Sequence, residues 1–357
     1  MKKKVLFFIG SISNPRGAER VTAIIANGLV NNGYEVEILS IFNGEKSFYE
    51  LDKQIKLSQL FQKKVDIKKN YLEILLKLRN FLKINNINII IDVDIILTLF
   101  TFIATIGLKI KLISWEHFNY LSNAGSSNRS LARRIALKFS DKIITLTEED
   151  REEFCKRTKN KQKIINISNP STFINEEPNL LNENIILTVG RLNYQKGYDL
   201  LIEKWMKIKE KYPNWKLEIA GEGEQRIELE SRIKELKLEN HVTLLGNVEN
   251  IEEKYKKSSI YVLCSRFEGL PMTLIEAKSF GLPIVALDCK TGPKEIIKDG
   301  IDGILVEDRN IELLVDKIIE LIENLDKRKK MGYNAFLDER YNRNSIVQNW
   351  VKMLEKL

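Results

Sequence analysis

Short apolar runs rich in β-branched residues recur along the chain and alternate with amphipathic segments. In the first half they cover residues 5–9, 35–41, 88–91, 111–115, 142–146 and 164–167, and in the second half 185–190, 216–220, 242–245, 260–264, 284–287 and 303–306. Continuous apolar runs with helices between them are typical of parallel sheets whose two faces are both covered. The pattern therefore predicts an α/β protein.

The two series are separated by a polar, proline-containing stretch at residues 171–184, which we interpret as a linker between domains. A chain of 357 residues is too long for one ordinary core. We predict a first domain at 1–172 and a second at 173–341, with a C-terminal helix at 342–357. Both domains are expected to be Rossmann-like, with parallel sheets that face each other across a cleft.

Charge is distributed unevenly between the two halves. Residues 1–170 contain 28 Lys and Arg against 17 Asp and Glu, a balance of +11, whereas the remainder has 29 against 32. A basic half indicates an anionic partner. The chain has no zinc knuckle and no aromatic residues interleaved with basic ones, so we expect no nucleic-acid binding. An anionic membrane surface or a diphosphate-bearing lipid fits the charge better.

Two basic amphipathic segments, at 61–83 and 129–138, carry much of this charge. The first includes Lys63, Lys64, Lys68 and Lys69, and the second includes Arg133 and Arg134. Basic side chains beside apolar ones favour contact with an anionic lipid surface. The alternative is that both segments are helices that cover their own sheet. No uncharged stretch is long enough to span a bilayer, and three scattered cysteines indicate a reducing compartment.

The segment 265–277, Ser-Arg-Phe-Glu-Gly-Leu-Pro-Met-Thr-Leu-Ile-Glu-Ala, places Glu268 and Glu276 eight positions apart around a Gly-Leu-Pro turn. It follows the apolar run 260–264, and a helix is predicted to begin at Pro271. Free backbone N–H groups at the start of a helix suit a phosphate, and carboxylates suit sugar hydroxyls. The spacing therefore indicates a nucleotide-sugar site, while two solvated acids near a helix start are the alternative.

This segment resembles the Glu-x7-Glu signature of the retaining glycosyltransferases of family 4, which have the GT-B fold, and other motifs extend the resemblance from residue 5 to about 340. It implies that Glu268 holds the transferred sugar, that Glu276 accepts hydrogen bonds from the ribose, and that Gly269 and Leu270 lie against the donor. It also implies that the C-terminal helix returns to the first domain, which binds the acceptor, while the second binds the nucleotide sugar.

The loop Val189-Gly190-Arg191-Leu192-Asn193-Tyr194-Gln195-Lys196-Gly197 follows the first apolar run of the second half, where a doubly wound sheet binds ligands. Its spacing is not that of a P-loop, because Lys196 precedes the glycine. It resembles the Gly-Arg-Leu…Lys-Gly element of the family, in which the residues matching Arg191 and Lys196 hold the donor diphosphate. A solvated basic loop is the alternative.

Weaker resemblances mark three further segments. The segment 10–20 matches the family's phosphate-side glycine loop, although Arg16 replaces its first glycine and only Gly17 is kept as a donor contact. In Gly246-Asn247-Val248, Asn247 and Val248 match a segment whose backbone pairs with the base, with a simple turn as the alternative. The segment 291–297, Thr-Gly-Pro-Lys-Glu-Ile-Ile, matches a ligand-side helix start or is an ordinary one.

His117 lies just past the apolar run 111–115, at the edge of the sheet where ligands bind in open α/β folds. A structural histidine is the alternative reading of this position. Family members often place a histidine near the reacting sugar, so the resemblance makes His117 a candidate catalytic residue beside Glu268.

The resemblance as a whole implies transfer of a hexosyl unit, with retention of configuration, from a nucleotide sugar such as a UDP-sugar to a hydroxyl of a growing glycan. The acceptor would be a lipid-linked glycan in bacterial surface polysaccharide synthesis. No metal and no other cofactor is expected. The enzyme is expected in the cytoplasm, peripheral on the inner face of the membrane. The alternative is a non-catalytic or phosphorolytic relative that binds a nucleotide or sugar phosphate.

Overall fold

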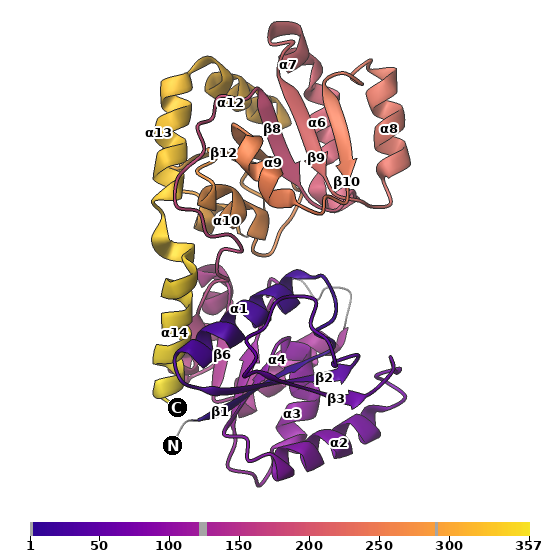
Figure 1. Cartoon of the computed structure of the whole chain (residues 1–357), viewed down its shortest axis with the longest axis vertical. Helices are drawn as coiled ribbons and strands as arrows, with labels where there is room; N and C mark the ends of the chain where they lie inside the picture. The colour runs from indigo at the N-terminus through magenta and orange to yellow at the C-terminus, as the bar shows by residue number, and fades with distance from the viewer. Residues whose placement is uncertain (1–2, 121–126, 290–291) are drawn as a thin grey trace. The chain divides into compact units, whose positions relative to one another are not determined.

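A computed structural model describes residues 3–120, 127–289 and 292–357 (Figure 1). The chain forms two compact units. Unit 1 comprises Met1–Thr172 and Tyr341–Leu357, and unit 2 comprises Phe173–Arg340. Among the described residues, no helix has both the length and the apolar character needed to cross a membrane.

Unit 1 is built on a seven-stranded parallel sheet with the order β3-β2-β1-β4-β5-β6-β7. Its strands are β1 (Lys4–Ile9), β2 (Glu35–Phe42), β3 (Lys56–Phe61), β4 (Ile89–Asp92), β5 (Lys111–Trp115), β6 (Lys142–Thr145) and β7 (Ile164–Asn166). Its helices are α1 (Gly17–Asn31), α2 (Tyr71–Ile84), α3 (Thr98–Ala104), α4 (Ser127–Phe139), α5 (Glu148–Cys155) and α14 (Arg343–Glu355). The predicted parallel α/β sheet is therefore confirmed in this half.

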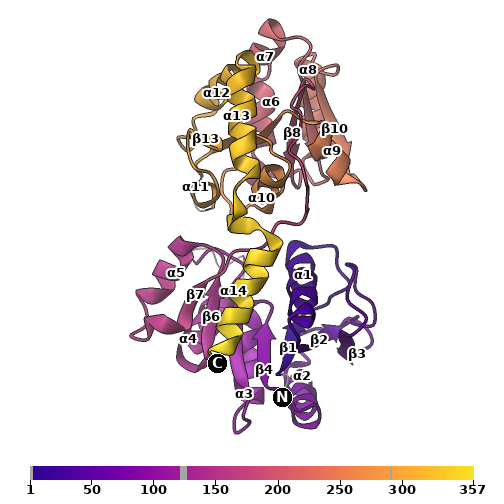
Figure 2. The same ribbon diagram turned by 60° about the vertical axis from the view of Figure 1, so that its left-hand side comes forward.

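Helix α14 joins unit 1 although it lies at the other end of the chain. It packs beside α1, as both ribbon views show (Figure 2). The indole of Trp350 is fully buried against Trp115 at the end of β5, with the ring centroids 4.7 Å apart. The Lys3 ammonium donates to the Leu354 carbonyl at 3.0 Å. Burial of an indole is worth several kcal/mol, so α14 is an integral part of the core of unit 1.

Unit 2 is built on a six-stranded parallel sheet with the order β10-β9-β8-β11-β12-β13. Its strands are β8 (Ile185–Val189), β9 (Lys216–Ala220), β10 (Val242–Gly246), β11 (Ile260–Leu263), β12 (Ile284–Leu287) and β13 (Gly303–Val306). Its helices are α6 (Tyr198–Lys204), α7 (Met206–Lys211), α8 (Arg226–Glu235), α9 (Ile251–Lys257), α10 (Met272–Ser279), α11 (Pro293–Ile296), α12 (Ile311–Glu323) and α13 (Leu325–Phe336). Every strand predicted for this half is present.

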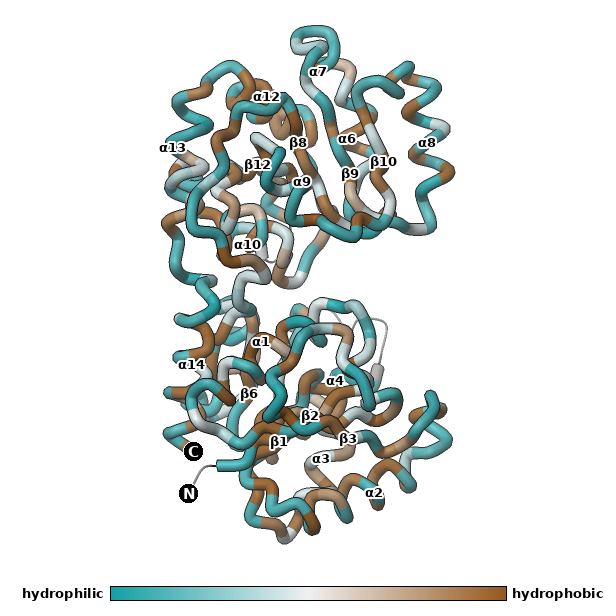
Figure 3. Tube along the Cα trace, in the orientation of Figure 1, coloured by the Kyte–Doolittle hydropathy of each residue, from teal (hydrophilic) through white to brown (hydrophobic). Residues whose placement is uncertain are grey.

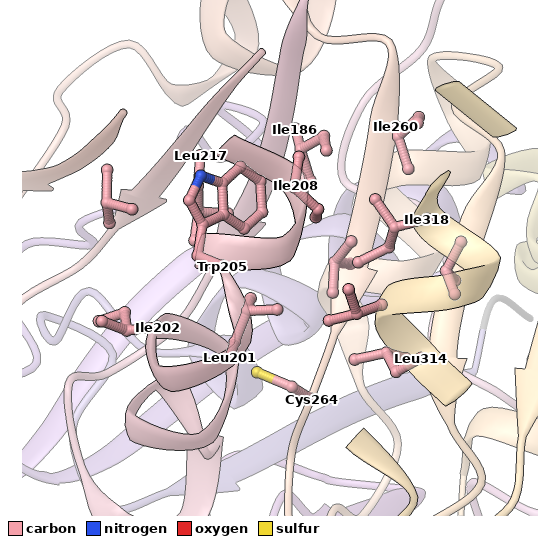
Figure 4. Packing of buried hydrophobic residues seen from close by; sticks show 14 of the residues in the cluster. Ile186, Leu201, Ile202, Trp205, Ile208, Leu217, Ile260, Cys264, Leu314 and Ile318 are labelled. Carbon is pink, nitrogen blue, oxygen red and sulfur yellow. The ribbon is translucent and has the colours of Figure 1, made fainter. Parts of the chain in front are cut away.

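Apolar residues run along the strands of both sheets, whereas in helices such as α12 and α13 they alternate with hydrophilic ones (Figure 3). In unit 2, Trp205 packs among isoleucines and leucines from β8, β9, α6 and α12, and its side chain is fully buried (Figure 4). Such cores fix the strands, so the loops at the strand ends are held in defined positions.

Three details of the sequence interpretation are wrong. The strand β3 was not predicted, because its sequence Lys-Leu-Ser-Gln-Leu-Phe is half polar, as suits an edge strand that is only partly covered. Segment 61–83 is not one helix, since α2 begins only at Tyr71. Residues 173–184 are not a loose linker: Phe173 packs against Tyr255, and Asn179 donates to its carbonyl at 2.7 Å, so this stretch is part of unit 2.

Candidate active site

The candidate donor residues of unit 2 follow the carboxyl ends of adjacent strands. Strand β8 lies in the middle of the sheet. The chain first adds β9 and β10 on one side of β8 and then crosses to add β11, β12 and β13 on the other side, so the strand order switches between β8 and β11. Open α/β sheets bind ligands at such a switch point, outside the carboxyl ends of the strands. The loops that carry Lys196 and Glu268 follow β8 and β11 and therefore meet here.

Lys196 and Glu268 form an ion pair at this point, with 2.7 Å between Nζ and Oε1. Their side chains are 15% and 7% exposed. The hydroxyl of Ser265 donates to the same Oε1 at 2.6 Å. A largely buried charge pair of this kind is costly to desolvate and needs these additional hydrogen bonds. Two motifs that lie 72 positions apart are thereby joined in one charged centre.

Sequence reasoning missed the contacts that hold these two loops together. Arg266 forms a two-pronged ion pair with Asp199 in the first turn of α6, at 2.8 and 2.6 Å. Its guanidinium also lies over the ring of Tyr194, 4.0 Å from the centroid, and its backbone N–H donates to the Gln195 carbonyl at 2.8 Å. The only signal in the sequence is an acidic residue in the first turn of a helix. The sequence does not show which basic residue pairs with it.

Gly197 is needed for the two loops to approach. Its φ is +70°, and a Cβ atom there would lie 2.2 Å from the carbonyl oxygen of Cys264. Any other residue would combine backbone strain with a clash against backbone. The structure therefore requires glycine after Lys196, in addition to the match of this position to the family motif.

Glu276 lies on α10, and the side chain is buried. The hydroxyl of Tyr255 donates to its Oε2 at 2.8 Å, which fixes the carboxylate. Helix α10 begins at Met272 rather than at Pro271, which is the N-cap residue with an extended backbone. The first turn of the helix nevertheless comes just after Gly269 and Leu270, as the prediction of a phosphate site at the start of this helix requires.

The loop after β12 touches the Glu-x7-Glu turn. Gly292 has φ +96°, and a Cβ atom there would lie 2.3 Å from the carbonyl oxygen of Gly269. The predicted helix start at 291–297 is α11, which begins at Pro293, and Thr291 lies outside the described residues. Loops from three neighbouring strand ends, those of β8, β11 and β12, therefore meet at the Glu-x7-Glu turn.

Arg191, Asn247 and Val248 lie farther along the same edge. Arg191 pairs with Glu224 at 3.1 Å, and its side chain is 69% exposed. Asn247 and Val248 follow β10, which is two strands away from β8. The Gly221 N–H donates to the Gly246 carbonyl at 2.9 Å and ties the loops after β9 and β10 together. The residues predicted for the base and for the diphosphate thus occupy one continuous rim.

Gly17 and His117 belong to unit 1. Gly17 is the first residue of α1, and a Cβ atom there would meet nothing within 4 Å. The fold alone does not demand glycine here, so the space over it is open to a ligand. His117 follows β5, and its ring is 4.5 Å from that of Trp115 between centroids. Both residues lie at the carboxyl edge of their sheet.

The loop of His117 is clamped by two arginines of α4, a second feature that sequence reasoning missed. Glu116 accepts from Arg129 at 2.8 Å and from Arg133 at 2.6 Å. Arg133 also donates to the carbonyl oxygens of Asn119 and Tyr120. Because Arg133 is 2% exposed, its proposed role at a membrane surface is wrong. Of the two arginines named in that segment, only Arg134 is exposed.

Burial lowers the pKa of His117 to about 4, because a desolvated imidazolium is disfavoured. We therefore expect the ring to remain neutral down to pH 5 and to accept or donate a hydrogen bond without a charge. The chain contains two histidines, so a His241→Gln variant leaves His117 as the only signal in an NMR titration of imidazole ¹³C shifts. A midpoint near 6.5 would contradict this assignment.

Comparisons with known proteins agree with this geometry. The family described as "Glycosyl transferases group 1" matches residues 171–338, and "Glycosyltransferase Family 4" matches residues 15–170. The chain belongs to these glycosyltransferases. It is 36% identical over 99% of its length to an uncharacterized glycosyltransferase of Haemophilus influenzae, of which it covers 100%.

The names of two further relatives of this glycosyltransferase state what they do. The amylovoran biosynthesis glycosyltransferase AmsD of Erwinia amylovora is 30% identical, with 98% of this chain and 99% of AmsD covered. A Campylobacter jejuni α-1,4-N-acetyl-D-galactosaminyltransferase that acts on a diNAcBac-PP-undecaprenol-linked glycan is 32% identical, with 99% of each covered. The Anabaena HepE structure in complex with UDP superposes with a TM-score of 0.82 at 20% identity over 100% of both chains, which shows the GT-B fold.

Proposed function

We propose that this glycosyltransferase transfers a hexosyl unit from a UDP-sugar to a hydroxyl of a lipid-linked glycan in bacterial surface polysaccharide synthesis. The observation that carries the proposal is the meeting of Lys196 and Glu268 at the switch point of the second sheet, beside the first turn of α10. The UDP in HepE and the undecaprenyl-diphosphate glycan in the name of the Campylobacter relative support the choice of donor and acceptor.

The leaving group of such a reaction is a nucleoside diphosphate, whose negative charge grows as the glycosidic bond breaks. Arg191, Lys196 and the backbone N–H groups at the start of α10 would stabilise that charge more strongly in the transition state than in the ground state. Because these groups supply positive charge, the proposed reaction requires no metal. Glu276 would accept hydrogen bonds from the ribose hydroxyls, and Asn247 and Val248 would contact the base.

Glu268 would hold the transferred sugar and face the positive charge that develops at its anomeric carbon. Lys196 contacts Glu268, and the same ammonium would bind the diphosphate, so the ion pair would couple recognition of the sugar to recognition of the diphosphate. His117 would hydrogen-bond the sugar as a neutral ring. Retention of configuration belongs to this proposal, and NMR of the newly formed anomeric proton tests it.

The donor assignment can be tested by thermal unfolding in the presence of a panel of nucleotide sugars. A ligand at 100 times its dissociation constant adds about 2.7 kcal/mol to stability, which should raise Tm by about 5 °C or more for a unit of this size. We expect a UDP-sugar to give the largest shift and Lys196→Ala to lose it. Equal, negligible shifts for every nucleotide sugar would contradict the proposal.

A non-catalytic or phosphorolytic relative remains the alternative function. A phosphorolytic enzyme of this fold would carry pyridoxal phosphate on a lysine, and its absorbance in the purified protein would reveal it. A binding-only protein would show donor protection without any transfer. Product formation from the protecting donor therefore separates the three functions.

The enzyme is proposed to work at the inner face of the cytoplasmic membrane. Lys63, Lys64, Lys68 and Lys69 are all exposed just before α2. Leu72 and Leu76, one turn apart on α2, are 70% and 67% exposed. Basic and apolar side chains on one surface favour reversible binding to anionic lipid, at about 1 kcal/mol for each basic residue.

Vesicle flotation tests this location. We expect binding to anionic but not to neutral vesicles, weakened by high salt because the attraction is electrostatic. Changing the four lysines 63, 64, 68 and 69 to Glu should abolish it. As a matched control, four exposed lysines of unit 2, at positions 234, 237, 329 and 330, changed to Glu, should leave binding intact. A protein that stays unbound with anionic vesicles at low salt would rule out the membrane assignment.

A further inference from the structure

A groove of about 710 Å³ lies within unit 1, and none of the candidate site residues described above is among its lining residues. Its lining comes from α1 and α14, which lie side by side (Figure 2), and from residues 49–52, which form a third flank. We call it the α1–α14 groove. It is lined by Arg20, Ala23, Ile24, Asn27, Gly28, Asn31, Asn32, Tyr49, Glu50, Leu51, Asp52, Thr172, Arg343, Asn344, Val347 and Gln348.

The two helices touch at the bottom of the groove. A Cβ atom at Gly28 would lie 2.4 Å from Cγ2 of Val347, so the helices approach more closely than any other residue at 28 would allow without rearrangement. At one end of the groove, the Gln348 side-chain amide donates to that of Asn32 at 3.0 Å. Near Thr172, the Arg343 guanidinium donates to the carbonyl oxygen of that residue at 2.7 Å.

The flank at residues 49–52 is held by one side chain of α1. The amide of Asn27 donates to the Glu50 carbonyl at 3.0 Å and accepts from the Asp52 N–H at 2.8 Å. The Arg20 guanidinium lies over the ring of Tyr49, 5.1 Å from its centroid. Both walls are therefore tied by specific contacts, and the groove is a built feature of the surface.

The lining indicates the class of ligand. Five side-chain amides line the groove, and three of them, on Asn27, Asn32 and Gln348, also bond within its walls. An amide has two N–H groups and an oxygen with two lone pairs, so all five retain the capacity both to donate and to accept, which is the pattern that hydroxyl and acetamido groups require. The lining includes two arginines and two carboxylates, Glu50 and Asp52, so the groove has no surplus charge that would select a phosphate. Four aliphatic side chains among sixteen residues are too few for a lipid tail. A neutral, hydroxyl-rich molecule fits best.

We propose that the α1–α14 groove binds a neutral oligosaccharide and is a second glycan site of the protein. The stripe on α1 from Arg20 to Asn31 is about 16 Å long, which exceeds the length of one sugar ring. The groove would hold a part of a glycan that is not reacting and raise its effective concentration at the enzyme. The inference rests on the proposed function in one respect, because it assumes that the ligands available to the protein are glycans.

The test uses the full chain and three probes: N-acetylglucosamine, tri-N-acetylchitotriose and maltotriose. Saturation-transfer NMR and calorimetry measure their binding. Asn344 lines the groove, whereas Asn349 is exposed on the same helix and does not line it. Asn344→Trp fills the groove and should weaken trisaccharide binding about tenfold or more, while Asn349→Trp should bind as the wild type does. Equal Tm values for the two variants exclude unfolding as the cause.

The inference is overturned if neither trisaccharide binds, if the monosaccharide binds as tightly as both trisaccharides, or if the two Trp variants lose binding equally. Failure of the proposed function looks different. In that case no nucleotide sugar protects the protein from unfolding, while trisaccharide binding and its sensitivity to Asn344→Trp persist. If a nucleotide sugar protects the protein from unfolding but no trisaccharide binds, only the groove assignment is contradicted.

Discussion

Lys196→Ala should lower kcat/KM for the donor by about 10- to 150-fold, because a charged hydrogen bond to a phosphate is worth about 1.5–3 kcal/mol. The loss should exceed that of Arg191→Ala. Lys196 is mostly buried in its pair with Glu268, whereas Arg191 is largely exposed and its attraction for a phosphate is screened by water. Both variants should keep the fold, since neither side chain belongs to a hydrophobic core.

The effect of Lys196→Ala contains a second contribution that must be separated. Its removal leaves Glu268, whose side chain is 7% exposed, without its partner cation. An uncompensated buried carboxylate is destabilising, so Tm should also fall. Lys196→Ala combined with Glu268→Gln should restore stability without restoring donor affinity.

Lys204→Ala is the matched control for the Lys196 measurement. Lys204 lies in the same unit and pairs with Glu312 on the surface, so its loss should leave both stability and kinetics nearly unchanged. Wild-type rates in both Lys196→Ala and Arg191→Ala would show that the diphosphate is held elsewhere.

The sequence predicted the sheets well because each buried strand carries its own signal. Twelve apolar runs became twelve strands, since a strand covered on both faces must be apolar along its whole length. Strand β3 was missed because an edge strand need not be apolar along its whole length. Its composition resembles that of a loop, since it contains Lys56, Ser58 and Gln59. Only its pairing with β2 makes it a strand, and pairing is not a local property.

The candidate site was predicted as separate motifs, and the structure adds the contacts between them. Nothing in the spacing of residues 190–197 and 265–277 states that Lys196 reaches Glu268, because that contact depends on β8 and β11 being neighbours. Arg133 gives a second example. The periodicity of its segment predicted an amphipathic helix correctly, but the Arg133 guanidinium is buried because it pairs with the buried carboxylate of Glu116. Charge patterns alone do not distinguish a surface cation from one with a buried partner.

Glu276 and Glu268 should separate in steady-state kinetics, although they belong to one motif. Glu276→Gln removes a charge that would bind the ribose in the ground state and the transition state alike, so KM for the donor should rise about tenfold with kcat almost unchanged. Gln keeps the shape of the side chain, and its amide remains beside the Tyr255 hydroxyl. The buried tyrosine is therefore not left unpaired.

Glu268→Gln should act on turnover instead. Its carboxylate would face the positive charge of the reacting sugar, which exists only in the transition state, so kcat should fall about 100-fold. KM should stay unchanged or fall, because the substitution frees Lys196 from its ion pair in the empty enzyme and leaves the ammonium available to the diphosphate. This opposite movement of KM distinguishes a sugar-facing carboxylate from a purely structural partner of Lys196, whose loss would disorder the loop and raise KM. If both glutamine variants changed KM alone, and in the same direction, the division of roles between the two glutamates would be wrong.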